Sequence, residues 1–140
     1  MNVDEKKIVS LDETKRLINE PTLDGKKVVL ADARPPQHFT GRKSGAWIAR
    51  AGHIPFAECF PWTANLTTDK VPVVRNSDQL REMYGSVGIK DDVLTVAYCR
   101  TGTEASVTYF VLRYLGYDVA LYDGSYFEWS KQPDTKIAAP

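Results

Sequence analysis

The chain has 140 residues, a length that suits one domain, since typical domains contain about 100–150 residues. Its 18 Lys and Arg residues balance 18 Asp and Glu residues, so no overall positive field recruits nucleic acid or an anionic membrane. No apolar stretch approaches the ~20 residues needed to span a bilayer, and the polar start of the chain does not resemble a signal peptide. We therefore expect a single domain over residues 1–140 without nucleic-acid or membrane partners. The expected compartment is the cytoplasm, or the periplasm if the segment comes from an exported protein.

The first part of the chain is predicted to contain two strands, one helix and a long loop. Residues 8–9 suggest a short strand, and the apolar residues of 11–18 form a loose helical stripe that Pro21 closes. Residues 27–32 indicate a buried strand that ends in a carboxylate. Residues 34–62 are rich in Pro and Gly, which predicts mostly loop.

The clearest strand of the sequence lies between two helices in the second part. Ser77 is a suitable N-cap for a helix that ends near Gly88. Residues 93–98 are continuously apolar, which is typical of a strand covered on both faces in a parallel sheet. Apolar residues recur at helical spacing over residues 107–115, and Gly116 is well placed to end that helix.

The chain is predicted to close with one more strand and a tail. Residues 119–122 form the strand, and residues 131–140 are expected to be an unstructured, flexible tail. Strand-like and helix-like segments thus alternate along the chain. This alternation predicts an α/β fold with a mainly parallel sheet.

Cys99 directly follows the apolar strand and precedes a helix. Ligands of open α/β sheets bind at this position, where the unpaired N–H groups of a helix N-terminus favour a thiolate. Arg100 adds a positive charge, and Gly102 allows a tight turn with positive φ. A cysteine placed in this way is suited to attack sulfane sulfur, hold it as a persulfide and release it to a second nucleophile. From the loop alone, this role and that of an inert cysteine at a strand end are about equally supported.

The second cysteine, Cys59, lies among aromatic neighbours. A free cysteine is usually a small buried hydrophobic residue, and we expect that role for Cys59. Two cysteines cannot form a metal site alone, and a disulfide framework is not expected at this count and chain length.

Several segments together resemble the rhodanese family. Residues 98–105, Tyr-Cys-Arg-Thr-Gly-Thr-Glu-Ala, resemble its active-site loop, where thiosulfate sulfurtransferases carry Cys-Arg-x-Gly followed by a small residue, Thr and Ala. Residues 32–34 resemble the family's Asp-x-Arg, and residues 51–55 its Gly-His-Ile-Pro. Residues 121–129 are similar to the Tyr-Asp-Gly-Ser…Trp that follows the catalytic helix. The resemblance extends from about residue 9 to 130, and the chain looks most like the C-terminal, catalytic module of tandem-domain sulfurtransferases.

The resemblance implies a rhodanese-like α/β fold with a central, mainly parallel five-stranded sheet flanked by helices. It also implies a sulfurtransferase that moves sulfane sulfur from thiosulfate or a related donor to a thiophilic acceptor through a persulfide on Cys99, without a cofactor or a metal. The implied partners are a small sulfur donor, a thiol or cyanide-like acceptor, and a preceding rhodanese-like domain or a sulfur-acceptor protein. The residues implied to bind substrate are Arg100, Thr101, Gly102, Thr103, Glu104 and His38, and those expected to support the pocket structurally are Asp32, Arg34 and His53.

Two departures from the family's pattern matter, and a minor one is Phe56, where the family usually has Gly. Tandem thiosulfate sulfurtransferases often carry Arg where this chain has His38, and a neutral imidazole binds an anion less well than a guanidinium. A surface histidine without a binding role fits the sequence equally well. Glu104 stands where the family usually has Thr, and its charge opposes a thiolate and repels thiosulfate. Thr101 and Glu104 also have the spacing of a capping box, so Glu104 is expected to stabilise the helix start.

Other functions remain as alternatives. A phosphatase or an arsenate reductase of this superfamily is disfavoured, because the phosphate-gripping Arg of Cys-x5-Arg is replaced by Ala105. Mercaptopyruvate sulfurtransferases usually carry Cys-Gly-Ser-Gly, whereas Arg100 and Thr101 favour thiosulfate or a persulfide donor. The last alternative is a catalytically weak rhodanese-like module used for docking or regulation. The intact cysteine loop argues against it, and the two departures leave it open.

Overall fold

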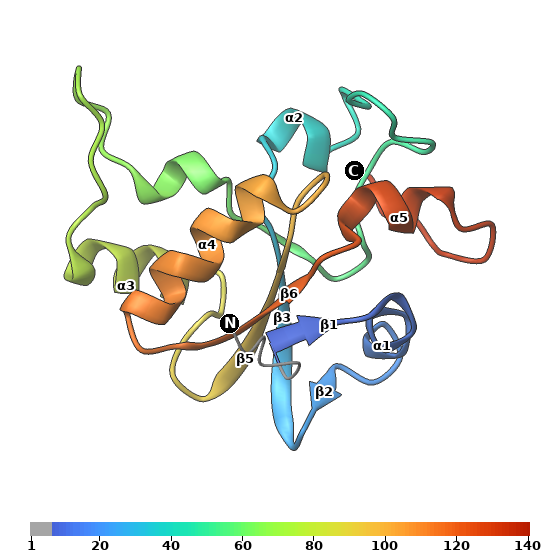
Figure 1. The fold of residues 1–140 in the computed structure, drawn as a ribbon, viewed down its shortest axis with the longest axis horizontal. Helices are drawn as coiled ribbons and strands as arrows, with labels where there is room; N and C mark the ends of the chain where they lie inside the picture. The colour runs from blue at the N-terminus through green and yellow to red at the C-terminus, as the bar shows by residue number, and fades with distance from the viewer. Residues whose placement is uncertain (1–6) are drawn as a thin grey trace, which may run out of the picture.

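The computed structural model describes residues 7–140, which form a curled sheet with helices on both faces (Figure 1). Residues 1–6 lie outside this range, and they belong to the start of the chain, where no signal peptide is expected. The strands are β1 (Ile8–Val9), β2 (Thr22–Leu23), β3 (Lys26–Asp32), β4 (Glu58–Cys59), β5 (Val93–Tyr98) and β6 (Asp118–Tyr122). The helices are α1 (Leu11–Leu17), α2 (Pro36–Phe39), α3 (Ser77–Gly85), α4 (Thr103–Tyr114) and α5 (Ser125–Lys131), with a short 3-10 helix at Trp62–Asn65. None of the helices in this described part is long and apolar enough to cross a membrane.

The sheet runs in the order β1, β6, β5, β3, β2, and β4 pairs with β3 outside this path. Every pair is parallel except the hairpin of β2 and β3. The expected α/β fold with a mainly parallel sheet is confirmed. The described residues contain six strands rather than the expected five, because Glu58–Cys59 of the long loop pairs with the end of β3. Asp32 consequently lies in register with both Cys59 and Tyr98, and the carboxyl ends of three strands meet there.

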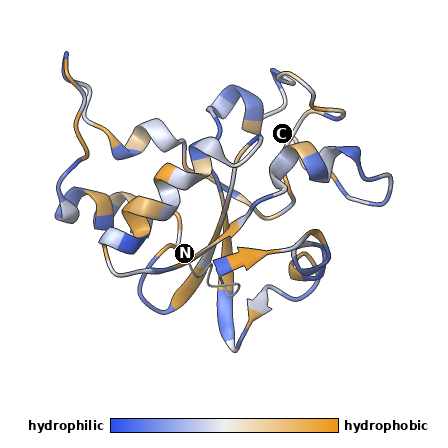
Figure 2. Ribbon diagram, in the orientation of Figure 1, coloured by the Kyte–Doolittle hydropathy of each residue, from blue (hydrophilic) through white to orange (hydrophobic). Residues whose placement is uncertain are grey.

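Two hydrophobic clusters cover the two faces of the sheet. Leu17 of α1 and Trp129 of α5 belong to the first, and Leu80 of α3 and Leu112 of α4 belong to the second. All six residues of β5 are buried between these layers, which explains the continuous apolar run of that strand. Figure 2 shows hydrophobic residues both on strands of the sheet, such as β1, and on turns of α3 and α4.

Local signals in the sequence explain where three helices begin or end. Ser10 and Glu13 form a capping box at the start of α1, in which each side chain accepts the other residue's backbone N–H. The N-cap of α3 is Asn76, one residue before the expected Ser77. Gly116 follows α4 with a φ of +81°, and its predicted role at the end of that helix is confirmed.

The C-terminal segment, predicted to be an unstructured tail, packs back onto the domain. His53 and Ala138 exchange two backbone hydrogen bonds of 2.8 and 2.9 Å. The indole Nε1 of Trp129 donates to the carbonyl of Lys136 at 2.9 Å. Gly52 has a φ of +124° and faces the carbonyl of Ala138 so closely that a side chain would collide with it. These partners lie far away in sequence, so the local composition did not indicate them.

Candidate active site

The loop between β5 and α4 turns a backbone N–H toward the sulfur of Cys99. Cys99 is 1% exposed, and its Sγ accepts a hydrogen bond from the N–H of Gly102 at 3.0 Å. Gly102 has a φ of +106°, a left-handed conformation in which a side chain would be strained. Its carbonyl accepts the N–H of Ser106 in the first turn of α4. A donor directed at sulfur in this way stabilises a thiolate more than a thiol.

The start of α4 differs from the sequence-based expectation. Its N-cap is Gly102, and no side chain there accepts a hydrogen bond from the first turn. The predicted capping box of Thr101 and Glu104 is therefore wrong. Because Gly102 takes the N-cap position, the residue that could reach back to it would be Ala105, which has no polar side chain.

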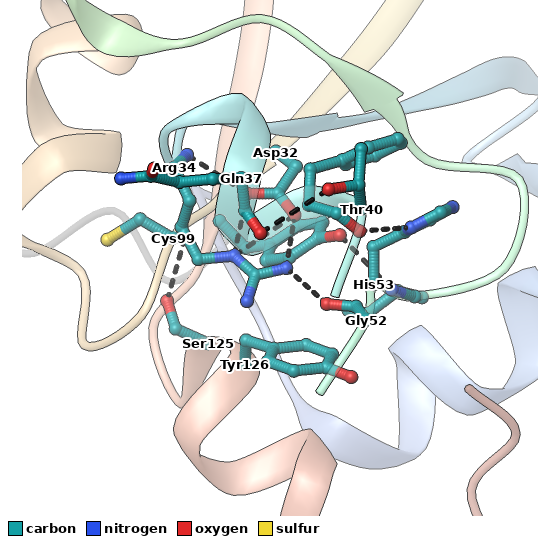
Figure 3. Close-up of polar contacts among 12 residues, drawn as sticks. Asp32, Arg34, Gln37, Thr40, Gly52, His53, Cys99, Ser125 and Tyr126 are labelled. Atoms are coloured by element: carbon teal, nitrogen blue, oxygen red, sulfur yellow. Dashed lines mark hydrogen bonds and ion pairs between the residues drawn. The ribbon is translucent and has the colours of Figure 1, made fainter. Parts of the chain in front are cut away.

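The opposite side of the cysteine loop is held by the first turn of α5. The N–H of Tyr126 donates to the carbonyl of Cys99 at 2.9 Å, and the N–H of Phe127 donates to the carbonyl of Arg100 at 3.0 Å. The N–H of Cys99 donates to Oγ of Ser125 at 3.3 Å (Figure 3). Backbone groups on both sides of the nucleophile candidate are thus fixed by a second helix.

Arg100 lies at the edge of the loop. Its side chain is partly buried, and its guanidinium carbon is 5.9 Å from the ring centre of Trp47. Trp47 is 72% exposed and has a left-handed backbone φ of +63°. Thr101 and Thr103 are exposed on either side of Gly102. Arg100, Thr101 and Thr103 thus retain exposed surface next to the buried Cys99, and their role in binding substrate stays a prediction.

Glu104 and His38, the two departures from the family's pattern, act on this same region. Glu104 lies in the first turn of α4, and His38 in the last turn of α2. Partial burial raises the pKa of the Glu104 carboxyl, and the nearby Arg100 and His38 act in the opposite direction. A dianionic ligand beside Arg100 would consequently meet a carboxylate as well as a guanidinium.

Asp32 and Arg34 form a buried ion pair behind the loop. Asp32 is fully buried, Arg34 is 2% exposed, and Nη2 of Arg34 lies 2.6 Å from Oδ2 of Asp32. Nη2 also donates to the carbonyl of Gly52 at 2.8 Å, and the guanidinium lies 4.0 Å from the ring centre of Tyr126 (Figure 3). Although burial alone would lower the pKa of Arg34, the hydrogen bonds and charge of Asp32 raise it, so Arg34 stays charged. The pair joins the end of β3 to the long loop and to α5.

The contacts of His53 connect α2 with the C-terminal segment. Its Nδ1 lies 2.7 Å from the carbonyl oxygen of Phe39, and its ring stacks on that of Phe39 with centroids 3.6 Å apart. The backbone of His53 pairs with Ala138. These contacts describe a residue that supports the loops around the site.

Cys59 ends β4 and has a different environment. It is half-buried and lies in register with Asp32. Burial raises the pKa of the Cys59 thiol to about 11, and the carboxylate of Asp32 adds to that rise. The structure therefore favours a protonated, unreactive thiol at this position.

Three residues at or near the site are not indicated by the sequence. Arg50 donates to the carbonyls of Ser130 and Thr135 at 2.9 and 2.8 Å, contacts that its local sequence does not suggest. Ser125 follows a turn signal, and nothing local suggests its contact with the cysteine loop. Trp47 is exposed, and its proximity to Arg100 depends on the tertiary fold.

Comparison with protein families gives a match over nearly the whole described chain. The model of the rhodanese-like domain matches residues 10–132. The thiosulfate sulfurtransferase of Pseudomonas aeruginosa is 37% identical over 107 residues, which cover 76% of this chain and 38% of that protein. The thiosulfate sulfurtransferase of Azotobacter vinelandii is 38% identical over 109 residues, with the same coverage of 76% and 38%. The sulfur carrier protein TtuD of Thermus thermophilus is 38% identical over 122 residues, covering 80% of this chain and 41% of TtuD. The chain thus spans about two fifths of the length of these relatives.

Solved structures share the fold. The anaerobic ergothioneine biosynthesis enzyme from Chlorobium limicola, in complex with trimethyl histidine, matches with a TM-score of 0.82 and 26% identity. A structure of EanB with ergothioneine covalently linked with a cysteine persulfide matches with a TM-score of 0.81 and 25% identity. Each alignment covers 96% of this chain and 32% of the other.

Proposed function

Because this chain belongs to the family of rhodanese-like domains, we propose that it is a sulfurtransferase domain that carries sulfur as a persulfide on Cys99. The observation that carries the proposal is the hydrogen bond from the N–H of Gly102 to Sγ of Cys99, in a loop at the N-terminus of α4. This donor and the positive end of the helix both favour the thiolate, which is the reactive form. The 12-residue length of α4 makes that helix terminus a substantial partial charge.

In the first half of the reaction, the Cys99 thiolate attacks the outer sulfur of thiosulfate. A new S–S bond forms to Sγ, the S–S bond of thiosulfate breaks, and sulfite leaves with the electron pair. The charge of the persulfide then lies on its outer sulfur, within reach of the N–H groups of the loop. Arg100 binds the departing dianion electrostatically at the edge of the site.

In the second half, a thiophilic acceptor attacks the outer sulfur of the persulfide. With cyanide as acceptor, a C–S bond forms, the S–S bond breaks, and the electron pair returns to Sγ as the thiolate. The cycle consumes no proton and needs no cofactor. A cysteine persulfide in a solved structure of EanB, which shares this fold, is in keeping with such an intermediate.

The relatives also bear on donor and partners. Two of them are named thiosulfate sulfurtransferase, which supports thiosulfate or a related sulfane donor for this chain. One is named a sulfur carrier protein, which supports a sulfur-acceptor protein as partner. We treat residues 1–140 as one domain, and a preceding rhodanese-like domain, as in tandem sulfurtransferases, remains the expected neighbour of such a unit.

The proposal is tested by cyanide-dependent release of thiocyanate from thiosulfate, with mercaptopyruvate as donor in parallel. We expect turnover with thiosulfate and less with mercaptopyruvate. The reverse preference would assign the chain to the mercaptopyruvate class. Release with neither donor, together with no sulfur taken up by the protein, would favour the docking or regulatory alternative and contradict the proposal.

A further inference from the structure

Ser125, the first residue of α5, occupies an unusual backbone conformation. It is fully buried and has a φ of +56°, in the left-handed region that residues other than glycine rarely adopt. Such conformations persist only where the surrounding structure holds them in place, and they are frequent at functional sites. Glycine would fit this backbone without strain, so the side chain of Ser125 calls for an explanation.

The hydroxyl of Ser125 joins two strands of the sheet. Its Oγ accepts the N–H of Cys99 at 3.3 Å (Figure 3). The same hydroxyl donates to the carbonyl of Tyr122 at 3.0 Å. Tyr122 ends β6, and Cys99 follows β5, its neighbour in the sheet. The hydroxyl therefore fixes the first backbone N–H of the cysteine loop relative to the end of the adjacent strand.

The next two residues of α5 complete this attachment. Tyr126 and Phe127 donate their N–H groups to the carbonyls of Cys99 and Arg100. With the N–H of Cys99 and the carbonyls of Cys99 and Arg100 bound to α5, the remaining part of the loop turns its Gly102 N–H toward Sγ of Cys99. The position of the sulfur relative to its donor thus depends on contacts made 26 residues later in the chain.

We infer that Ser125 is a positioning residue, whose hydroxyl holds the cysteine loop in the conformation that directs the Gly102 N–H at Sγ of Cys99. The inference rests on the proposed function of Cys99, because it explains how that thiolate is kept reactive. It requires no contact between Ser125 and the substrate.

The test is the pH dependence of Cys99 alkylation in Ser125→Ala, measured in a Cys59→Ser background. Loss of the hydroxyl loosens the loop, so the midpoint of the alkylation rate should move upward by about half a pH unit, the scale of one hydrogen bond. Sulfur uptake from thiosulfate at pH 7 should fall by about threefold for the same reason.

Ser130→Ala is the matched control. Ser130 is also a buried serine of α5, and its Oγ likewise accepts a backbone N–H, that of Ala49 at 3.2 Å. It has no hydrogen bond with the cysteine loop, so we expect its removal to lower stability without moving the alkylation midpoint. An equal shift in both variants, or a loss of stability in Ser125→Ala with an unmoved midpoint, would overturn the inference.

Ser125→Gly separates the hydroxyl from the backbone strain. Glycine relieves the strain at φ +56° but also removes the hydroxyl, so this variant should be more stable than Ser125→Ala and show the same midpoint shift. It also keeps the test available if Ser125→Ala does not fold. A wild-type midpoint in Ser125→Gly would overturn the inference. Since alkylation needs no sulfur transfer, wild-type protein that takes up no sulfur would refute the proposed function without affecting this result.

Discussion

The two cysteines of the chain lie at the same edge of one sheet but in opposite chemical environments. Cys59 ends β4 and Cys99 follows β5, and these two strands flank β3 on either side of Asp32. Burial and the Asp32 carboxylate raise the pKa of Cys59 to about 11. Cys99 instead receives a backbone N–H from the loop that opens α4.

The difference lies in the element that follows each strand. After Cys59 the chain continues through Phe60 and Pro61 into a short 3-10 helix, and no hydrogen bond to its sulfur is present among the described residues. After Cys99 a left-handed Gly102 lets the chain fold back over the sulfur. A place at the carboxyl edge of a parallel sheet is therefore not sufficient for a reactive thiol. Under the proposed function, the turn at Gly102 that brings a backbone N–H to the sulfur is the feature that distinguishes Cys99 from Cys59.

Replacing each cysteine by serine tests this contrast with the largest expected effect. Cys99→Ser should lower thiosulfate turnover by roughly a thousandfold or more, because it removes the nucleophile. Cys59→Ser should keep most of the activity. Steady-state release of thiocyanate measures both variants, and circular dichroism confirms that each is folded. Loss of activity in a folded Cys59→Ser protein would mean that Cys59, and not Cys99, is the nucleophile.

The ion pair of Asp32 and Arg34 lies between the two strands that lead to the cysteines. Its loss should affect the stability of the fold more than the rate of sulfur transfer. Arg34→Met leaves the buried carboxylate of Asp32 without its partner, which should lower the free energy of unfolding by about 3–5 kcal/mol. Urea denaturation measures the change. The matched control is Lys26→Met, which breaks the exposed pair of Lys26 with Asp118, a contact of 2.8 Å, and should cost about 1 kcal/mol or less. Equal costs in the two variants would mean that the buried pair is not essential to the fold.

A smaller, kinetic effect is expected at Arg100, which directly follows Cys99. Arg100→Ala should raise the KM for thiosulfate by about tenfold, because a charge-assisted contact with the donor is lost. The free energy of unfolding should change by no more than about 0.5 kcal/mol, as is usual at a surface. Arg113→Ala, which removes an exposed Arg from the last turn of α4, is the control for net charge. Unchanged kinetics with every donor would remove Arg100 from the site.

The smallest expected effect concerns Glu104 and His38. Glu104→Thr combined with His38→Arg should raise kcat/KM for thiosulfate by about fivefold, since a carboxylate is removed and a permanent cation is added. Stability should hardly change, because Glu104 makes no capping hydrogen bond. An unchanged kcat/KM for thiosulfate would show that neither Glu104 nor His38 affects the reaction with this donor.

The raised pKa of Glu104 adds a pH dependence to this prediction. As the pH falls toward that pKa, which lies above the ordinary value of 4.5, the carboxylate of the wild-type protein gains a proton and its repulsion of thiosulfate disappears. The KM for thiosulfate should therefore decrease toward acid pH in wild type and less so in Glu104→Thr. Parallel KM profiles in the two proteins would contradict this role of Glu104.

Much of the fold could be predicted because the relevant signals are local. The uninterrupted apolar run of β5 indicated a strand buried on both faces, and Gly116 indicated the end of α4. The capping box at Thr101 and Glu104 was wrong, since a pattern of residue types does not reveal that the intervening Gly102 adopts a left-handed conformation and becomes the N-cap itself.

Ser125 and the C-terminal segment could not be predicted as supports of the candidate site, for a different reason. Ser125 contacts Cys99 from 26 residues away, and the C-terminal segment meets His53 across most of the chain. Pairings of this kind depend on how the helices pack on the sheet, about which periodicity and turn signals carry no information. The sequence therefore indicated the nucleophile candidate, its immediate neighbours and three expected supports, Asp32, Arg34 and His53. It did not indicate the groups of α5 that hold the cysteine loop.

The most direct measurement of the difference between the two cysteines is peptide mass mapping after incubation with thiosulfate. Wild type and Cys59→Ser should each gain the mass of one sulfur atom, on the peptide that contains Cys99, and cyanide should remove it. Cys99→Ser should gain none. Sulfur found on Cys59 in the wild-type protein, or a gain retained in Cys99→Ser, would contradict the assignment of Cys99 as the sulfur carrier.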